Sequence, residues 1–132
     1  MPRVTGSFDV RLTPQEADSR AEVAFLARLA IDKRFLGPLE ATSAGQMLAT
    51  QDGAVGSGGY VALEQVVGTL DGRRGGFVLQ HSGHMVRNQT SLEINVVADT
   101  GTGELAGLAG RMAIEIDADG AHTYAFDYTL PG

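Results

Sequence analysis

The chain has 132 residues, with 10 basic and 16 acidic groups, a formal net charge of −6 and no cysteine. This length suits one domain, residues 1–132, built around one core. The lack of cysteine excludes disulfides, thiol catalysis and cysteine metal sites. The acidic balance argues against a nucleic-acid partner, because such binding depends on Lys and Arg neutralising phosphates. Glycine occurs 18 times, about twice its average usage, which indicates a turn-rich protein.

The sequence contains no recognisable targeting signal. Residues 1–6 lack the apolar stretch of a secretory signal. The longest apolar window, residues 21–31, is interrupted by Glu22 and Arg28, and is far shorter than the roughly 20 residues that cross a bilayer. We therefore expect a cytoplasmic protein with no membrane partner.

The N-terminal part mixes strand and helix signals. A strand is predicted over residues 8–12. Thr13-Pro14-Gln15-Glu16 then resembles a helix capping box with proline at the first helical position, and good helix formers follow. Residues 14–22 are accordingly predicted to be a short helix or a loop, with a strand beginning near Val23 and covering residues 29–35.

Alternating apolar and polar residues dominate the rest of the chain, which indicates β-strands. Strands with this alternation are predicted over residues 77–81, 92–97, 112–117 and 124–130. Residues 60–67 are apolar on both faces except for Glu64 and Gln65, which predicts a strand covered on both sides. Asp71-Gly72 and Asp119-Gly120 are hairpin signals of the type I′ turn. Asp52-Gly53, Ser82-Gly83 and residues 100–103 predict three further reversals.

These elements add up to an all-β protein, an antiparallel meander of about eight strands. A sheet of that size can close into a barrel that removes its exposed edges. The adjacent glycines at 58–59 and 75–76 fit strongly coiled strands that must bend. The glycine-rich run 101–110 has neither the lysine nor the strand–loop–helix context of a phosphate loop, so we interpret it as a turn leading into the strand at Arg111.

Six ordered blocks together resemble a known family. They are residues 45–48 (GQML), 56–64 (GSGGYVALE), 68–73 (GTLDGR), 76–83 (GFVLQHSG), 101–110 (GTGELAGLAG) and 122–128 (HTYAFDY). This order resembles a bacterial family of unknown function with an allene oxide cyclase-like β-barrel. The resemblance implies an eight-stranded barrel with a central cavity and a homo-oligomer, but no reaction. Relatives often carry an acid where this chain has Gln46, so a catalytic acid at that position would be missing here.

Glu64 is the first candidate catalytic residue. Its neighbours on the same strand face are Ala62 and Val66. A carboxylate among aliphatic side chains would have a raised pKa, which suits proton transfer. The alternative is that Glu64 points outward and pairs with Arg or Lys on a neighbouring strand.

His81 is the second candidate, because it continues the apolar face of Phe77 and Leu79. His122 similarly precedes Tyr124 and Phe126. Either imidazole could relay a proton or orient an oxygenated ligand; the alternative is that each anchors a strand end beside a turn. His84 is interpreted as a surface residue in a turn. No metal site is predicted, because strand residues three apart face opposite sides and the chain has no HExxH-type helical pair.

A ligand chamber is predicted from apolar and aromatic side chains on the strands. The alternative for each is ordinary barrel core, since eight-stranded barrels are either filled or hold one small ligand. The predicted lining residues are Gln46, Met47, Tyr60, Phe77, Met112, His122, Tyr124, Phe126 and Tyr128.

The leading functional hypothesis is a cofactor-independent isomerase, cyclase or lyase that transfers a proton on a small apolar substrate held in the barrel. It predicts that Glu64→Gln removes turnover with little loss of thermal stability. One alternative is a non-catalytic binding protein for a small hydrophobic metabolite. Another is a filled barrel that serves only as an oligomerisation unit.

Overall fold

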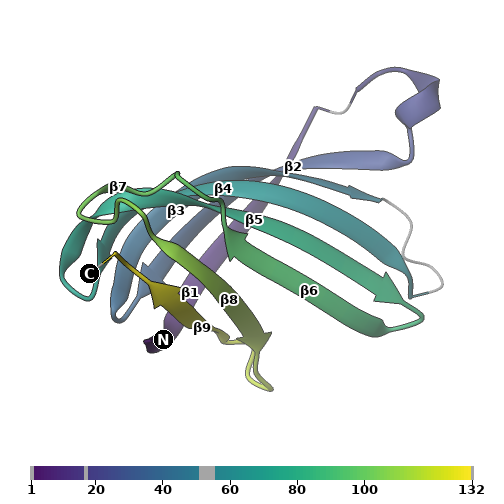
Figure 1. The fold of residues 1–132 in the computed structure, drawn as a ribbon. Coiled ribbons are helices and arrows are strands. Elements are labelled where there is room, and N and C mark those ends of the chain that lie inside the picture. Colours follow the sequence, from purple (N-terminus) through teal and green to yellow (C-terminus); the bar gives the residue numbers. More distant parts are fainter. Residues whose placement is uncertain (1, 17, 51–55, 132) are drawn as a thin grey trace.

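Antiparallel strands make up most of the chain in the computed structural model, which describes residues 2–16, 18–50 and 56–131. Figure 1 shows the strands side by side in one strongly curved sheet. The elements are β1 (Arg3–Gln15), η1 (Ala21–Val23), β2 (Leu26–Leu36), β3 (Leu39–Thr50), β4 (Gly58–Leu70), β5 (Arg73–Val86), β6 (Gln89–Val96), β7 (Thr102–Gly103), β8 (Ala109–Ile116) and β9 (His122–Thr129).

The strands close into an eight-stranded barrel. The hydrogen-bonded order is β4-β3-β2-β1-β9-β8-β6-β5, and the pairing of β4 with β5 completes the ring. The short β7 is an extra strand on β5. The predicted all-β antiparallel barrel is confirmed.

Two hairpins are made by two-residue turns whose residues both have positive φ. The predicted turn at Asp71 (φ 49°) and Gly72 (φ 82°) joins β4 to β5. The β5–β6 turn, at Arg87 (φ 46°) and Asn88 (φ 71°), carries no glycine and was not predicted. Asp119-Gly120 was wrongly predicted to be type I′, because only Gly120 has a positive φ there. In that loop the Asp117 carboxylate accepts from the backbone N–H of 119 and 121.

The predicted reversal at Ser82-Gly83 is wrong, because β5 runs straight through both residues. Gly83 serves packing instead. A Cβ on it would lie 2.2 Å from the ring of Tyr60 on the adjacent strand, so the missing side chain makes room for that ring. The Asp52-Gly53 prediction lies outside the described residues.

Helix signals near residue 14 are overridden by strand pairing. β1 continues to Gln15, and Pro14 lies opposite Leu29 of β2. Proline is tolerated there because this part of β1 lacks a partner on its other side, where pairing with β9 ends at Phe8. Among the described residues of this segment, Ala21–Val23 adopts a helical turn of the 3-10 type.

One end of the barrel is densely packed. Phe77 and Phe126 stack with ring centroids 5.8 Å apart, and Phe35 packs edge-on to Tyr124. Leu105 and Leu108, from the glycine-rich run, are buried in the same core. That run is a series of turns leading into β8, as predicted, and its two leucines plug this end.

The other end splays open. β1 pairs with β9 only from Arg3 to Phe8, and β6 pairs with β8 only at Ile94 and Asn95. Figure 1 shows β6 and β8 diverging, and the β1–β2 hairpin projecting from the body. The inward side chains beyond this point therefore border an opening.

Candidate functional site

Four polar side chains meet in the barrel interior between its packed and open ends. We call Lys33, Ser43, Glu64 and His81 the charged cluster. All four are buried, and Glu64 is 0% exposed. Lys33 Nζ lies 2.8 Å from Glu64 Oε2, Ser43 Oγ lies 2.8 Å from Oε1, and His81 Nε2 lies 2.5 Å from Oε2. The Glu64 carboxylate thus holds three partners.

The local sequence explains how the Glu64 carboxylate of β4 reaches side chains of β3 and β2 inside the barrel. Glu64 of β4 is opposite Gly45 of β3. A Cβ on Gly45 would come within 2.7 Å of the Glu64 Cα and 2.9 Å of its Cβ. With no side chain there, the glutamate is unobstructed on its β3 side, toward Ser43 and, one strand further, Lys33. Lys33 Nζ also lies 5.1 Å from the ring centroid of Phe8, a cation–π distance.

The predicted raised pKa of Glu64 is wrong. Burial does raise it, as expected, but the hydrogen bond from His81 and the charge and hydrogen bond of Lys33 outweigh burial and lower the pKa to about 2. Glu64 therefore stays ionised at neutral pH. The alternative, that Glu64 points outward and pairs with Arg or Lys, is correct only in part. Glu64 does pair with a lysine, Lys33, but the pair lies inside the barrel. Removing the carboxylate would leave Lys33 buried and unpaired, so Glu64→Gln should destabilise the fold.

His81 lies mid-strand on β5, so the interpretation that it anchors a strand end is wrong. Its Nε2 is held by Glu64. No described residue bonds its Nδ1, and 4% of the His81 side chain is exposed.

The opening beyond this cluster is a hollow of about 500 Å³ lined mainly by apolar side chains. We call it the mouth, and define it by Met47, Tyr60, Met85 and Leu92, which point inward from β3, β4, β5 and β6. The ring of Tyr60 is 6.3 Å from that of His81, which connects the mouth to the cluster. Burial and the nearby Glu64 raise the pKa of the Tyr60 hydroxyl.

Only part of the predicted chamber lies at the mouth. Met47 and Tyr60 do. Phe77, Phe126 and Met112 instead belong to the packed core, because the interior is filled at their level. His122 begins β9 and packs against Phe8 at 5.1 Å.

The other two tyrosines are structural anchors at the packed end. The Tyr124 hydroxyl lies 3.0 Å from the Leu36 carbonyl and accepts from the Leu39 N–H at 3.1 Å. The Tyr128 hydroxyl donates to the Asp71 carboxylate in the β4–β5 turn. Their hydroxyl groups are thus occupied by the protein itself.

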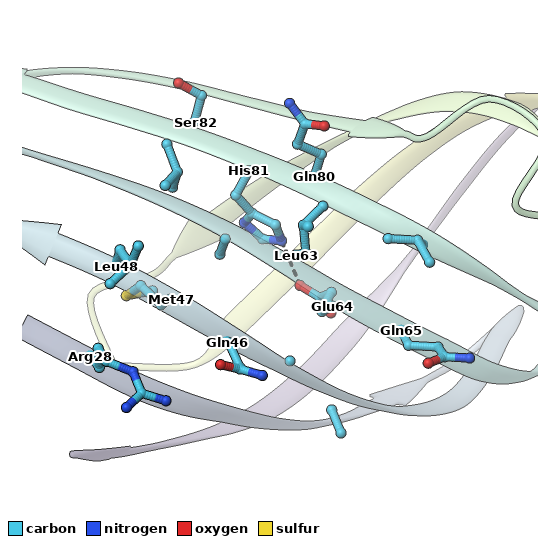
Figure 2. A pocket seen from close by; sticks show the side chains of 15 residues that line it. Arg28, Gln46, Met47, Leu48, Leu63, Glu64, Gln65, Gln80, His81 and Ser82 are labelled. Atoms are coloured by element: carbon cyan, nitrogen blue, oxygen red, sulfur yellow. Dashed lines mark hydrogen bonds and ion pairs between the residues drawn. The ribbon is translucent and has the colours of Figure 1, made fainter. Parts of the chain in front are cut away.

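Gln46 lies on the opposite surface of the sheet. It is exposed, while its strand neighbours Ser43, Gly45 and Met47 face inward. A second hollow, of about 840 Å³, has Gln46, Arg28, Leu48, Leu63 and Gln80 in its lining, and Glu64 and His81 also border it. Figure 2 shows these residues spread over four neighbouring strands, with the His81–Glu64 bond beside them.

No cluster of three or more metal-ligating side chains occurs among the described residues. His84 is exposed on β5 and faces away from His81, which lies in the cluster. The described residues also form no helix long and apolar enough to span a membrane.

Sequence reasoning missed Lys33 and Ser43. A signal for Lys33 was present, because the alternation of Ile31, Lys33 and Phe35 places a lysine on the apolar face of its strand. A charged residue at such a position is costly without a partner, which points to an interior anion. Ser43 gave no comparable signal.

Comparison with known proteins agrees with this architecture. A crystal structure of a protein of unknown function from Shewanella oneidensis, of the DUF3224 family, is 50% identical; the alignment covers 100% of this chain and 98% of that one, with a TM-score of 0.92. A search of curated proteins gives no match. The model of the family "Protein of unknown function (DUF3224)" matches residues 4–128. The chain therefore belongs to the DUF3224 family.

Proposed function

We propose that the protein binds a small apolar molecule in the mouth and transfers a proton on it, as a cofactor-independent isomerase, cyclase or lyase. The observation that carries the proposal is the His81–Glu64 pair at 2.5 Å beside an apolar opening. A carboxylate bound to one imidazole nitrogen fixes the ring and its tautomer, leaving the other nitrogen as the base.

The roles of the two residues follow from their bonds. Glu64 stays ionised and accepts the proton on His81 Nε2, so the lone pair is on Nδ1. In the proposed step Nδ1 takes a proton from a carbon next to a carbonyl group, and the imidazolium that forms is stabilised by the adjacent carboxylate. Returning that proton to another atom of the same molecule gives an isomer, with no electron donor or acceptor needed. The apolar walls orient the substrate.

The test compares His81→Gln with His122→Gln. His122 is on β9, packs against Phe8 and borders neither the mouth nor the second hollow. 5-Nitrobenzisoxazole is a suitable probe, because a single proton abstraction opens its ring and releases a coloured product. We expect the unmodified protein to accelerate ring opening, His81→Gln to lower the rate by roughly 100-fold, and His122→Gln to leave it unchanged. Equal rates in the two variants would contradict the proposal.

The second candidate is a binding protein that performs no chemistry. The lining of the mouth favours it, because apolar walls with few polar groups are typical of small-molecule sites. Native mass spectrometry after incubation with a lipophilic cell extract distinguishes the two functions. A binding protein returns its ligand with unchanged mass and structure, whereas an enzyme releases an isomer or fragment.

A further inference from the structure

The outer surface of β3, β4 and β5 has no charged side chain along its central stretch. We call this surface the outer face; its residues are Thr42, Ala44, Gln46, Leu48, Val61, Leu63, Gln65, Val67, Val78, Gln80 and Ser82. Four aliphatic members are largely exposed: Leu48 46%, Val61 55%, Leu63 53% and Val67 58%. Contiguous exposed apolar surface of this kind marks interaction sites.

The opposite side of the barrel shows what an ordinary solvated surface looks like in this protein. There β1 and β9 present charged and hydroxyl side chains, and Arg3 and Asp127 form a two-pronged ion pair at 2.7 and 2.9 Å. The chain carries 26 charged residues, so their absence from the central stretch of the outer face is a local property. Depletion of charge with apolar and amide groups at the centre is the composition of an interface core.

Strand register places opposite charges at the two borders of this face. One cross-strand row runs from Arg28 of β2 through Leu48, Val61 and Ser82 to Glu93 of β6. The row next to it runs from Ala30 through Gln46, Leu63 and Gln80 to Asn95. Each row is centred on an aliphatic residue of β4. The first ends in a cation on one side and an anion on the other, and the second carries an amide on each side of Leu63.

We propose that the outer face packs against the same face of a second copy of this chain, about a two-fold axis that runs along β4. Such an axis places β4 on β4 and exchanges β2 with β6. Arg28 then meets Glu93 of the partner subunit, twice by symmetry. Gln46 meets Gln80 of the partner subunit, and an amide can donate and accept at once. Val61, Leu63 and Val67 meet their own counterparts at the centre.

The charged residues at the two borders determine which surface can pack against this one, and the aliphatic residues at the centre supply the contact area. Arg28 already donates to the Glu16 carbonyl at 2.7 Å, but a guanidinium has five N–H donors, so the others are free for a carboxylate. Two sheets packed face to face interdigitate their side chains, and the hollow over this face provides space for those of the partner. The interface does not depend on the proposed function, because it lies on the other surface of the sheet from the mouth.

Sedimentation equilibrium of the full chain tests the aliphatic centre. We expect a dimer at micromolar concentration for the unmodified protein and a monomer for Leu63→Glu, with circular dichroism confirming that the variant is folded. Val61→Lys is a second variant with the same expectation. Ile116→Glu is the control, since Ile116 is 66% exposed but lies on β8, and it should leave the dimer intact. A monomeric unmodified protein, or a dimer that survives both outer-face substitutions, would overturn the proposal.

Reversing the charges of Arg28 and Glu93 tests the proposed two-fold axis along β4. Arg28→Glu and Glu93→Arg should each weaken dimerisation tenfold or more, because each places like charges together at both borders. The double variant restores opposite charges and should recover the affinity of the unmodified protein to within about threefold. A double variant no tighter than either single one would overturn the two-fold arrangement. An assembly larger than two subunits would also overturn it, because the proposed contact is closed.

Discussion

The two ends of the barrel are built from the same alternating strands but differ in how they end. At the packed end, β1–β9 and β8–β9 pairing and the Leu105–Leu108 plug leave no space. At the open end the β6–β8 ladder stops after two residue pairs, so inward side chains border solvent. The difference shows that strand pairing length, and not side-chain composition alone, decides where a barrel is hollow.

The charged cluster lies where these two regimes meet. Packed aromatics on one side deprive its charges of water, which makes their pairing strong and its loss costly. The mouth lies on the other side, where the ring of Tyr60 is 6.3 Å from that of His81. A cluster deeper in the barrel would be purely structural, and one nearer the rim would be solvated.

The largest expected effect comes from emptying the packed end. Phe126 is fully buried and stacks on Phe77 and Tyr128. Phe126→Ala should lower the free energy of unfolding by about 4 kcal/mol, through lost burial and the cavity left behind. Leu92→Ala at the mouth should cost less than about 1 kcal/mol, because that site is already open. Urea denaturation of both variants measures the contrast, and equal losses would show that the ends are packed alike.

Breaking the cluster should have the next largest effect. Glu64→Gln leaves Lys33 buried without its anion and should cost about 3 kcal/mol. Combining it with Lys33→Met removes both charges and should recover part of that loss. The measurement is again urea denaturation at pH 7. A double variant less stable than Glu64→Gln would contradict the explanation that the loss comes from leaving Lys33 buried without its anion.

The same carboxylate predicts an acid-sensitive fold. Its pKa is lowered from 4.5 to about 2 in the folded chain, so the unfolded chain binds the proton more tightly. Its stabilising contribution is therefore complete above about pH 4.5 and is lost as the pH falls toward 2. Thermal melts between pH 6 and 2 should show a steeper loss of stability for the unmodified protein than for Glu64→Gln. Parallel curves would contradict this assignment.

A smaller difference in stability is expected between variants of Tyr124, at the packed end, and Tyr60, at the mouth. Tyr124→Phe removes a hydroxyl that joins the Leu36 and Leu39 backbone groups and should cost about 1 to 2 kcal/mol. Tyr60→Phe should change stability by less than about 0.5 kcal/mol, because the Tyr60 hydroxyl bonds none of the described residues. Thermal unfolding of the pair measures the difference. A larger loss at Tyr60 would reverse the comparison between the two ends.

The barrel was predictable from sequence because alternation and turn chemistry are local signals. Residues 112–117 and 124–130 show the two-residue period directly, and Asp71-Gly72 specifies its own turn. The failures had physical reasons. Pairing with β2 overrode the helix signals after Thr13. Gly83 leaves space for the ring of Tyr60 and does not form a turn.

The candidate site was predictable only in part. Glu64 and His81 could be selected because polar residues interrupt apolar strands. Their contact could not, since it depends on register between β4 and β5, and the ionisation of Glu64 depends on Lys33 from a strand two positions away. Which aromatics line the mouth depends on where the β6–β8 ladder ends, and no residue pattern marks that point.

The pairing of β1 with β9 has a practical consequence for protein engineering. Arg3 lies opposite Asp127 in this ladder, so the first and last strands are neighbours at the end remote from the mouth. A short linker could join them, with new termini opened at the exposed Arg87-Asn88 turn. Such a circular permutant would keep every strand pair, and it would test whether the barrel folds without a fixed starting strand.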